Sequence, residues 1–183
     1  MPCHVPPHRD TPQSHAGHRL AMAKLACRDV PGFTVDDWEI LRDTPSFTVD
    51  TLQHLRSLHG AVMPLVFIMG MDAFNTFSHW NQWQEILQLS HLWIAHRPGS
   101  KVPDKDAVEA NIIEQHAVET PAELLQSPAG KLFIYETTVL DISATKLRQD
   151  IAQGHDPRFL LPDTVWSYIQ QHSLYRSHLE QTL

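Results

Sequence analysis

The sequence has little cysteine and lacks any long apolar run. Only Cys3 and Cys27 occur among its 183 residues, and no CxxC pair is present. A disulfide framework or a zinc site built on thiolates is therefore not expected. No apolar run approaches the roughly 18 residues of a membrane span, and no segment has the charged-then-apolar pattern of a signal peptide. These absences predict a reducing, cytoplasmic setting and no membrane partner.

Positive charge is also scarce. The chain has 14 basic and 21 acidic residues, which gives a formal net charge of −7. This balance argues against a nucleic-acid polymer or an anionic membrane surface as the main partner, although it permits a local basic pocket. A length of 183 residues suits a single domain with a proper core. We expect one domain over residues 1–183, of which residues 142–183 form a helical carboxy-terminal part.

Hydrophobic patterning predicts an α/β fold. Three apolar segments have the pattern of strands, namely PLVFIMG (64–70), HLWIAHRPG (91–99) and KLFIYET (131–137). The first is a continuous apolar run closed by glycine, which is typical of a strand buried on both faces. Helices are expected at 18–27, 46–60, 78–90, 143–154 and 161–175, with Ser46 or Thr48 capping the second. Residues 33–42 suggest an edge strand, and residues 100–130 a surface excursion with some helix. This alternation is typical of a parallel sheet covered on both faces.

The segment ISATKLR, residues 142–148, is the most informative strand-to-helix junction. Parallel sheets bind ligands beyond the carboxyl ends of their strands. Ser143 and Thr145 can cap the helix or bond a ligand oxygen, and Arg148 lies one turn further on the same face. Hydroxyl, open backbone amides and guanidinium together suit a polyphosphate. The alternative is an ordinary capping residue beside a solvated arginine.

Four other residues near strand ends are candidates for a ligand site. Gly70 lets a ligand approach the backbone, and Asp72 can accept from ribose hydroxyls or cap the following helix. Trp80 can stack on a flat ring, although an aromatic residue at helical spacing is more often part of a core. Arg97 is either a binding residue or a solvated arginine before a Pro-Gly turn.

Taken together, these segments resemble a known family. Residues 67–87, 91–99, 142–148 and 159–176 are similar, in order and spacing, to bacterial nicotinate-nucleotide adenylyltransferase. VPPHR (5–9) and PSFTVDTL (45–52) match it too, so the resemblance covers residues 1–176. It implies a Rossmann-like, doubly wound fold with helices on both faces of the sheet. The implied enzyme transfers AMP from ATP to nicotinate mononucleotide, forms deamido-NAD and pyrophosphate, and uses Mg²⁺ with ATP.

The resemblance also implies roles for individual residues. Thr48 helps to hold the nicotinate end through its backbone, and Trp80 stacks on the pyridine ring. Asn81 stands where family members often have an aromatic residue, and its backbone N–H can still meet the nicotinate carboxylate. The remaining implied roles are nucleotide binding by Gly70 and Asp72, an adenylate-side position for Arg97, and ATP phosphate binding by Ser143, Thr145 and the catalytic Arg148.

The amino-terminal stretch departs from the family pattern. In the family, VPPHR follows the second strand, whereas here it begins at residue 5. We therefore expect the first strand, the GGxFDPxHxGH loop, the following helix and most of the second strand to be missing from the chain as written. A chain without that phosphate-cradling loop should be weakly stable and essentially inactive. The HxGH string at 15–18 is not expected to replace the loop, because no buried strand or double glycine precedes it.

Two alternative functions follow from the same residues. The cluster formed by Cys3, His4, His8, His15 and His18 suggests a metal-binding module, although the spacing matches no compact zinc finger. A zinc assay would separate this hypothesis from the enzyme. The other alternative is an inactive protein that keeps the nucleotide pocket for sensing. The motifs leave open both the choice between acid and amide mononucleotide and the oligomeric state.

Overall fold

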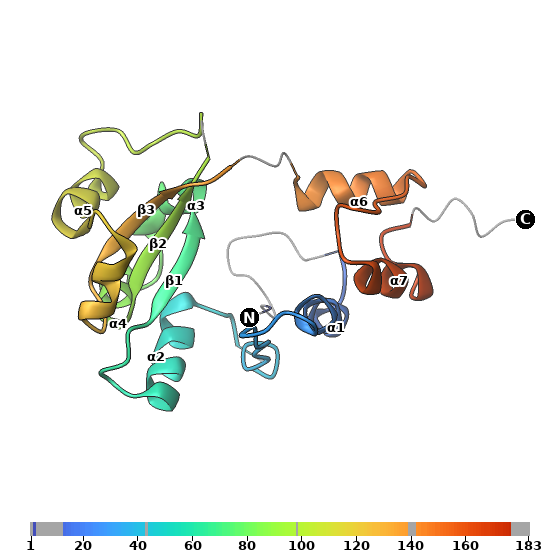
Figure 1. The fold of residues 1–183 in the computed structure, drawn as a ribbon, viewed down its shortest axis with the longest axis horizontal. Helices are drawn as coiled ribbons and strands as arrows, with labels where there is room; N and C mark the ends of the chain where they lie inside the picture. Colours follow the sequence, from blue (N-terminus) through green and yellow to red (C-terminus); the bar gives the residue numbers. More distant parts are fainter. Residues whose placement is uncertain (1, 3–12, 43, 98, 139–141, 177–183) are drawn as a thin grey trace, which may run out of the picture. The chain divides into compact units, whose positions relative to one another are not determined.

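The structure of the chain is a computed structural model that describes residue 2 and residues 13–42, 44–97, 99–138 and 142–176. The chain forms two compact units (Figure 1). One unit is Phe47–Val139 and contains the sheet, and the other combines Met1–Ser46 with Leu140–Leu183. No helix in the described ranges is long and apolar enough to cross a membrane.

A three-stranded parallel sheet lies at the centre of the first unit. Its strands are β1 (Val66–Gly70), β2 (His91–His96) and β3 (Leu132–Glu136), in the order β1-β2-β3. The register pairs Met69 with Ile94, and Ile94 with Ile134. The three predicted strands and the α/β class with a parallel sheet are confirmed.

Helices and 3-10 turns connect the strands. They are α2 (Thr48–His59), α3 (Met71–Phe74), η1 (Phe77–His79), α4 (Trp83–Leu89), α5 (Val108–His116) and η2 (Pro121–Gln126). Gly60 has φ 83° and ends α2 as predicted, because glycine adopts this left-handed region without strain. The predicted cap of α2 is wrong. Phe47 occupies the N-cap position without a side-chain bond, and Thr48 is already the first helical residue.

The predicted helix over 78–90 is too long. Only α4, from Trp83 to Leu89, is regular helix, because Gln82 adopts a left-handed conformation with φ 51°. A helix cannot continue through such a residue. Trp80 therefore precedes α4 and ends η1 instead of sharing a helical face with Trp83.

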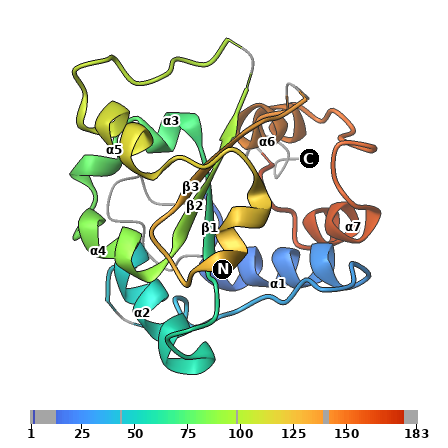
Figure 2. The same cartoon turned by 60° about the vertical axis from the view of Figure 1, so that its left-hand side comes forward.

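The core of this unit lies on one face of the sheet. Met69, Leu92, Ile94 and Leu132 point to the same face, where they pack with the apolar residues of α2 and α4. Both views show α2 and α4 side by side (Figures 1 and 2). The prediction that 64–70 is buried on both faces is wrong. Ile68 is 68 % exposed, because its side chain alternates with that of Met69 and points to the face opposite the core.

A buried histidine joins β2 to the turn before β3. The His91 side chain is fully buried, its Nε2–H donates to the Ser127 carbonyl (2.7 Å), and its Nδ1 accepts from the Lys131 backbone N–H (3.0 Å). A second proton on Nδ1 would face that N–H. Burial lowers the pKa of His91, and the nearby charges of Lys131 and Arg56 lower it further against the raising effect of the Ser127 bond. The imidazole is therefore neutral in the folded protein.

This arrangement predicts a loss of stability in mild acid. Because the folded pKa lies below the unfolded value of 6.5, the unfolded state binds the extra proton more readily. The free energy of unfolding should be highest above about pH 6.5 and fall as the pH decreases through the lowered pKa. Urea unfolding at about pH 7.5 and about pH 5 measures this dependence. His91→Gln should reduce it, whereas His59→Gln, at the exposed end of α2, should not. Equal pH dependence in all three proteins would contradict the assignment.

In the described residues of the second unit the helices are α1 (Ala16–Cys27), α6 (Ala144–Ala152) and α7 (Asp163–Gln171). A small apolar cluster centred on Ile151, Val165 and Ile169 packs with side chains of α1. All three helices correspond to predicted helices. The edge strand predicted at 33–42 is wrong, because Asp36 Oδ1 accepts from the Trp38 backbone N–H (2.8 Å) and turns the chain.

Candidate functional site

The start of α6 brings together three of the predicted site residues. Ser143 is the N-cap, and its hydroxyl accepts from the Lys146 backbone N–H (3.0 Å). The Arg148 guanidinium donates through Nη2 to the Thr145 hydroxyl (3.4 Å). Both the capping role of Ser143 and the shared face of Thr145 and Arg148 are therefore present, as the spacing predicts.

The charge at this helix start favours an anion. The first turn of α6 has no acidic residue, and Lys146 lies three residues after the cap. Asp150 lies further along the helix, where it faces His155 at 3.7 Å. Unpaired N–H groups at a helix N-terminus, a hydroxyl and a guanidinium on one exposed face are the donors that phosphate oxygens accept from.

The carboxyl end of the sheet carries a second set of predicted residues. Gly70 is the last residue of β1 and the N-cap of α3, and Asp72 is exposed in the first turn of that helix. The alternative that Asp72 caps α3 is wrong, because Gly70 occupies that position. A Cβ atom at Gly70 would meet nothing within 4 Å, and its φ of −81° suits any residue. Neither packing nor backbone conformation therefore requires glycine there.

Arg97 lies at the same edge of the sheet. It directly follows β2, whose Ala95 pairs with Gly70. Its side chain is exposed, and its carbonyl accepts from the backbone N–H and the hydroxyl of Ser100 (3.0 and 2.8 Å). The turn after β2 thus holds the backbone of Arg97 while the guanidinium stays accessible.

Trp80 and Asn81 lie in the bend between η1 and α4. The Trp80 ring is half-buried and meets Phe67 at 6.1 Å and Phe77 at 5.7 Å between ring centroids. Asn81 is exposed and precedes the left-handed Gln82. The indole is held from one side and remains accessible elsewhere, which is compatible with both a core position and a stacking surface.

Thr48 is the first residue of α2 and is half-buried. The first N–H groups of a helix have no carbonyl partner within the helix. The residue can therefore offer a backbone N–H to a ligand oxygen, as its implied role requires. The neighbouring Val49 is fully buried and fixes this end of α2 in the core.

The histidines of the HxGH string have structural partners. His15 is the N-cap of α1 and accepts from the Gly17 N–H (3.2 Å). His18 Nδ1 lies 2.9 Å from the Tyr168 hydroxyl, and its ring is 5.1 Å from that of His172. His15 thus lies at the cap of α1, and His18 lies in its first turn. Cys3, His4 and His8 lie outside the described residues, among which no group of three metal-binding side chains occurs.

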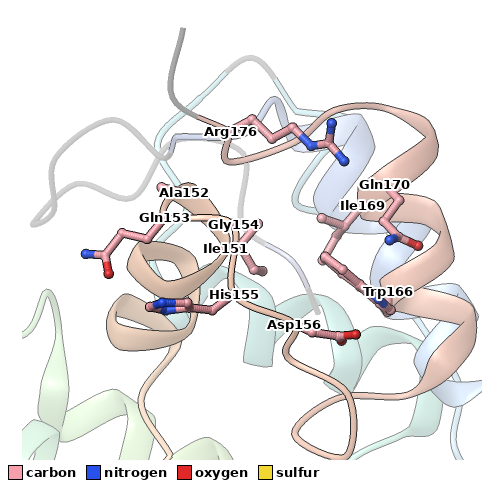
Figure 3. Close-up of a pocket in the computed structure, with 10 residues that line it drawn as sticks. All are labelled: Ile151, Ala152, Gln153, Gly154, His155, Asp156, Trp166, Ile169, Gln170 and Arg176. Carbon is pink, nitrogen blue, oxygen red and sulfur yellow. The ribbon is translucent and has the colours of Figure 1, made fainter. Parts of the chain in front are cut away.

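A hollow of about 680 Å³ occurs in the unit that contains α6 and α7. Figure 3 shows it between the end of α6, with the loop that follows, and α7. Ile151 and Ile169 form apolar walls, and His155, Asp156 and Arg176 contribute polar groups. None of the residues predicted from the sequence lines this hollow, and nothing in its lining assigns it to the same chemistry.

Glu109 is a buried carboxylate that no predicted role includes. It lies in α5 and is 4 % exposed. The sequence signal was its spacing, because positions 109, 112, 113 and 116 share one helical face and Ile112 is buried on it.

Comparisons with known proteins identify the family of the chain. The profile of the cytidylyltransferase-like family matches residues 1–150. The nicotinate-nucleotide adenylyltransferase of Salmonella typhimurium is 41 % identical over 176 residues, which are 96 % of this chain and 83 % of the relative. A probable nicotinate-nucleotide adenylyltransferase of Hahella chejuensis is 42 % identical over 175 residues, covering 96 % of this chain and 80 % of the relative.

Two solved structures share the fold. Both are Plasmodium falciparum nicotinic acid mononucleotide adenylyltransferase, one complexed with APC and one with NaAD. Their TM-scores are 0.58 and 0.61 at 16 % sequence identity, and they cover 88 % and 94 % of this chain. The alignments cover 76 % and 79 % of those chains.

Proposed function

The chain belongs to the nicotinate-nucleotide adenylyltransferases, within the cytidylyltransferase-like family, and we propose that the start of α6 binds the phosphates of its ATP substrate. The reaction of this enzyme transfers AMP from ATP to nicotinate mononucleotide and yields deamido-NAD and pyrophosphate. The observation that supports the phosphate assignment is the grouping of Ser143, Thr145 and Arg148 at one helix N-terminus.

The chemistry requires positioning and charge stabilisation more than covalent help. An oxygen of the nicotinate mononucleotide phosphate attacks the α-phosphorus of ATP, and the bond between that phosphorus and the bridging oxygen to pyrophosphate breaks. Negative charge grows on the leaving pyrophosphate as this bond lengthens. Arg148 stabilises that charge, and the free N–H groups at the start of α6 reinforce it. The hydroxyls of Ser143 and Thr145 orient the phosphates.

Mg²⁺ is proposed to arrive with ATP as part of the substrate. Magnesium keeps several waters and is commonly bound by substrate phosphates with only one or two carboxylates.

The sheet unit is proposed to bind the mononucleotide. Trp80 would stack on the pyridine ring, and the backbone N–H groups at Asn81 and Thr48 would meet the nicotinate carboxylate. At the carboxyl edge of the sheet, Gly70 leaves open space for a ligand, and the side chains of Asp72 and Arg97 are exposed to contact it. These assignments are supported by accessibility and by the positions of the residues at the ends of β1, β2 and η1.

We expect nicotinate mononucleotide to bind at least about tenfold more tightly than its amide. The reason is that a carboxylate accepts charge-assisted bonds worth roughly 1.5–3 kcal/mol, which a neutral carboxamide does not match. Isothermal titration calorimetry of both ligands with the protein measures the difference. Formation of deamido-NAD and pyrophosphate from the acid and ATP tests the overall reaction in the same preparation. Equal affinity for the two mononucleotides would contradict the proposed carboxylate contacts.

A further inference from the structure

Glu109 connects α5 to the segment that carries Trp80. Its carboxylate is buried to 4 % exposure, and one oxygen accepts from the backbone N–H of Ser78 (2.9 Å). Ser78 lies in η1, two residues before Trp80, whereas Glu109 lies in the first turn of α5. The bond thus links positions 31 residues apart within the sheet unit.

The carboxylate is charged in this position. Burial alone would raise the pKa of Glu109, but hydrogen bonds from the side chain and backbone of Ser78 outweigh it, and nearby His79 adds to their effect. The net result is a lowered pKa. The first turn of α5 also favours a negative charge, because helix N-termini are electropositive. A buried ion held in this way has a defined geometry and transmits it to its partner.

Apart from the Glu109 bond, the segment from Phe77 to Gln82 is held by aromatic contacts and by local backbone hydrogen bonds. Phe77 is fully buried and stacks on Phe74 at 5.8 Å, which fixes the start of the segment. The Trp80 backbone N–H donates to the Phe77 carbonyl (2.9 Å), and Gln82 then turns into α4 with φ 51°. The Glu109 bond to Ser78 therefore acts in the turn that sets the direction of Trp80 and Asn81.

We infer that Glu109 is a positioning residue for the mononucleotide substrate, because its bond to Ser78 fixes the bend that presents Trp80 and Asn81. The inference rests on the proposed function of those two residues. Glu109 does not touch the substrate in this scheme. It holds the bend so that the indole face and the following backbone N–H groups are already in place when the mononucleotide binds, and binding pays no additional ordering cost.

The test is steady-state kinetics with the wild-type protein and three variants at this position. Glu109→Ala is expected to raise KM for nicotinate mononucleotide about tenfold, with KM for ATP and kcat changed by less than about threefold. Glu109→Gln keeps an oxygen that can accept from the Ser78 N–H and should restore KM to within about threefold of the wild-type value. Glu109→Asp keeps the charge but is one methylene shorter, and should give an intermediate KM. If the alanine variant does not fold, the aspartate and glutamine variants decide the matter.

The Trp80→Ala variant distinguishes the proposed mononucleotide pocket from the positioning role of Glu109. It is expected to raise KM for the mononucleotide whether or not Glu109 positions the bend. A raised KM in Trp80→Ala together with an unchanged KM in Glu109→Ala would overturn the inference and leave the proposed function intact. An unchanged KM in Trp80→Ala would overturn the proposed pocket and the inference with it. If Glu109→Ala instead lowers kcat and raises KM for both substrates to a similar extent, the variant is generally destabilised. That result would also overturn the inference.

Discussion

Replacing Arg148 with alanine is expected to lower kcat by about a hundredfold or more, with a smaller effect on KM for nicotinate mononucleotide. The guanidinium lies one turn into α6, bonded to the Thr145 hydroxyl at 3.4 Å, at a helix start with no acidic residue in its first turn. Its positive charge stabilises the transition state most as pyrophosphate departs, because the negative charge on the leaving group is greatest at that step. The loss should therefore appear in the chemical step.

Pyrophosphate release under saturating ATP and mononucleotide measures this effect. Arg148→Lys should recover part of the rate, since a lysine retains the charge but not the two-pronged donor geometry. Arg158→Ala serves as a matched control, because Arg158 is an exposed arginine of the same unit whose partner is Asp156. Its kcat should stay within about twofold of the wild-type value. An Arg148→Ala protein with unchanged kcat would remove the phosphate-binding role from α6.

Replacing Arg56 with alanine is expected to destabilise the protein by about 3 kcal/mol or more. Arg56 donates to four backbone carbonyls from separate parts of the sheet unit. Nε donates to Leu89 (2.8 Å), Nη2 to Pro128 (2.7 Å), and Nη1 to both Gly60 (3.2 Å) and Met63. A charged donor shared among the end of α4, the turn after α2 and the turn before β3 joins three connections at one point.

Unfolding of the protein in urea, followed by tryptophan fluorescence, measures this loss of stability. Arg56→Lys should be intermediate, because an ammonium group cannot reach four carbonyls spread in this way. His59→Ala changes an exposed residue at the end of the same helix and should alter the free energy of unfolding by less than about 0.5 kcal/mol. A change of that small size in Arg56→Ala would show that the carbonyls are satisfied equally well by water.

Several elements could be predicted from the sequence because their causes are local. The strands at 66–70, 91–96 and 132–136 follow from short apolar runs bounded by turns, and Gly60 ends α2 through its own conformational freedom. The start of α6 is equally local, because Ser143 caps the helix three residues from its partner Lys146. The same is true of His15, which caps α1 through Gly17. Interactions over two to four residues leave a signal in spacing that can be read without the fold.

Other features were decided only by contacts between distant parts of the chain or by single backbone angles. The exposure of Ile68 depends on which face of β1 the core covers, which an apolar run does not reveal. Trp80 lies outside the predicted helix because Gln82 is left-handed. The segment expected as a strand at 33–42 turns because the Asp36 carboxylate accepts from the Trp38 backbone N–H.

The sequence by itself determined the α/β class, the family and the helix start that offers a phosphate site. The tertiary structure decided which polar side chains are buried and what they hold. Glu109 bonds Ser78 across 31 residues, His91 bonds Ser127 and Lys131, and Arg56 reaches Pro128 across 72 residues. The physical reason is that a buried polar group is stable only with a partner, and that partner is supplied by whichever segment the packing brings near, not by the neighbours in the sequence.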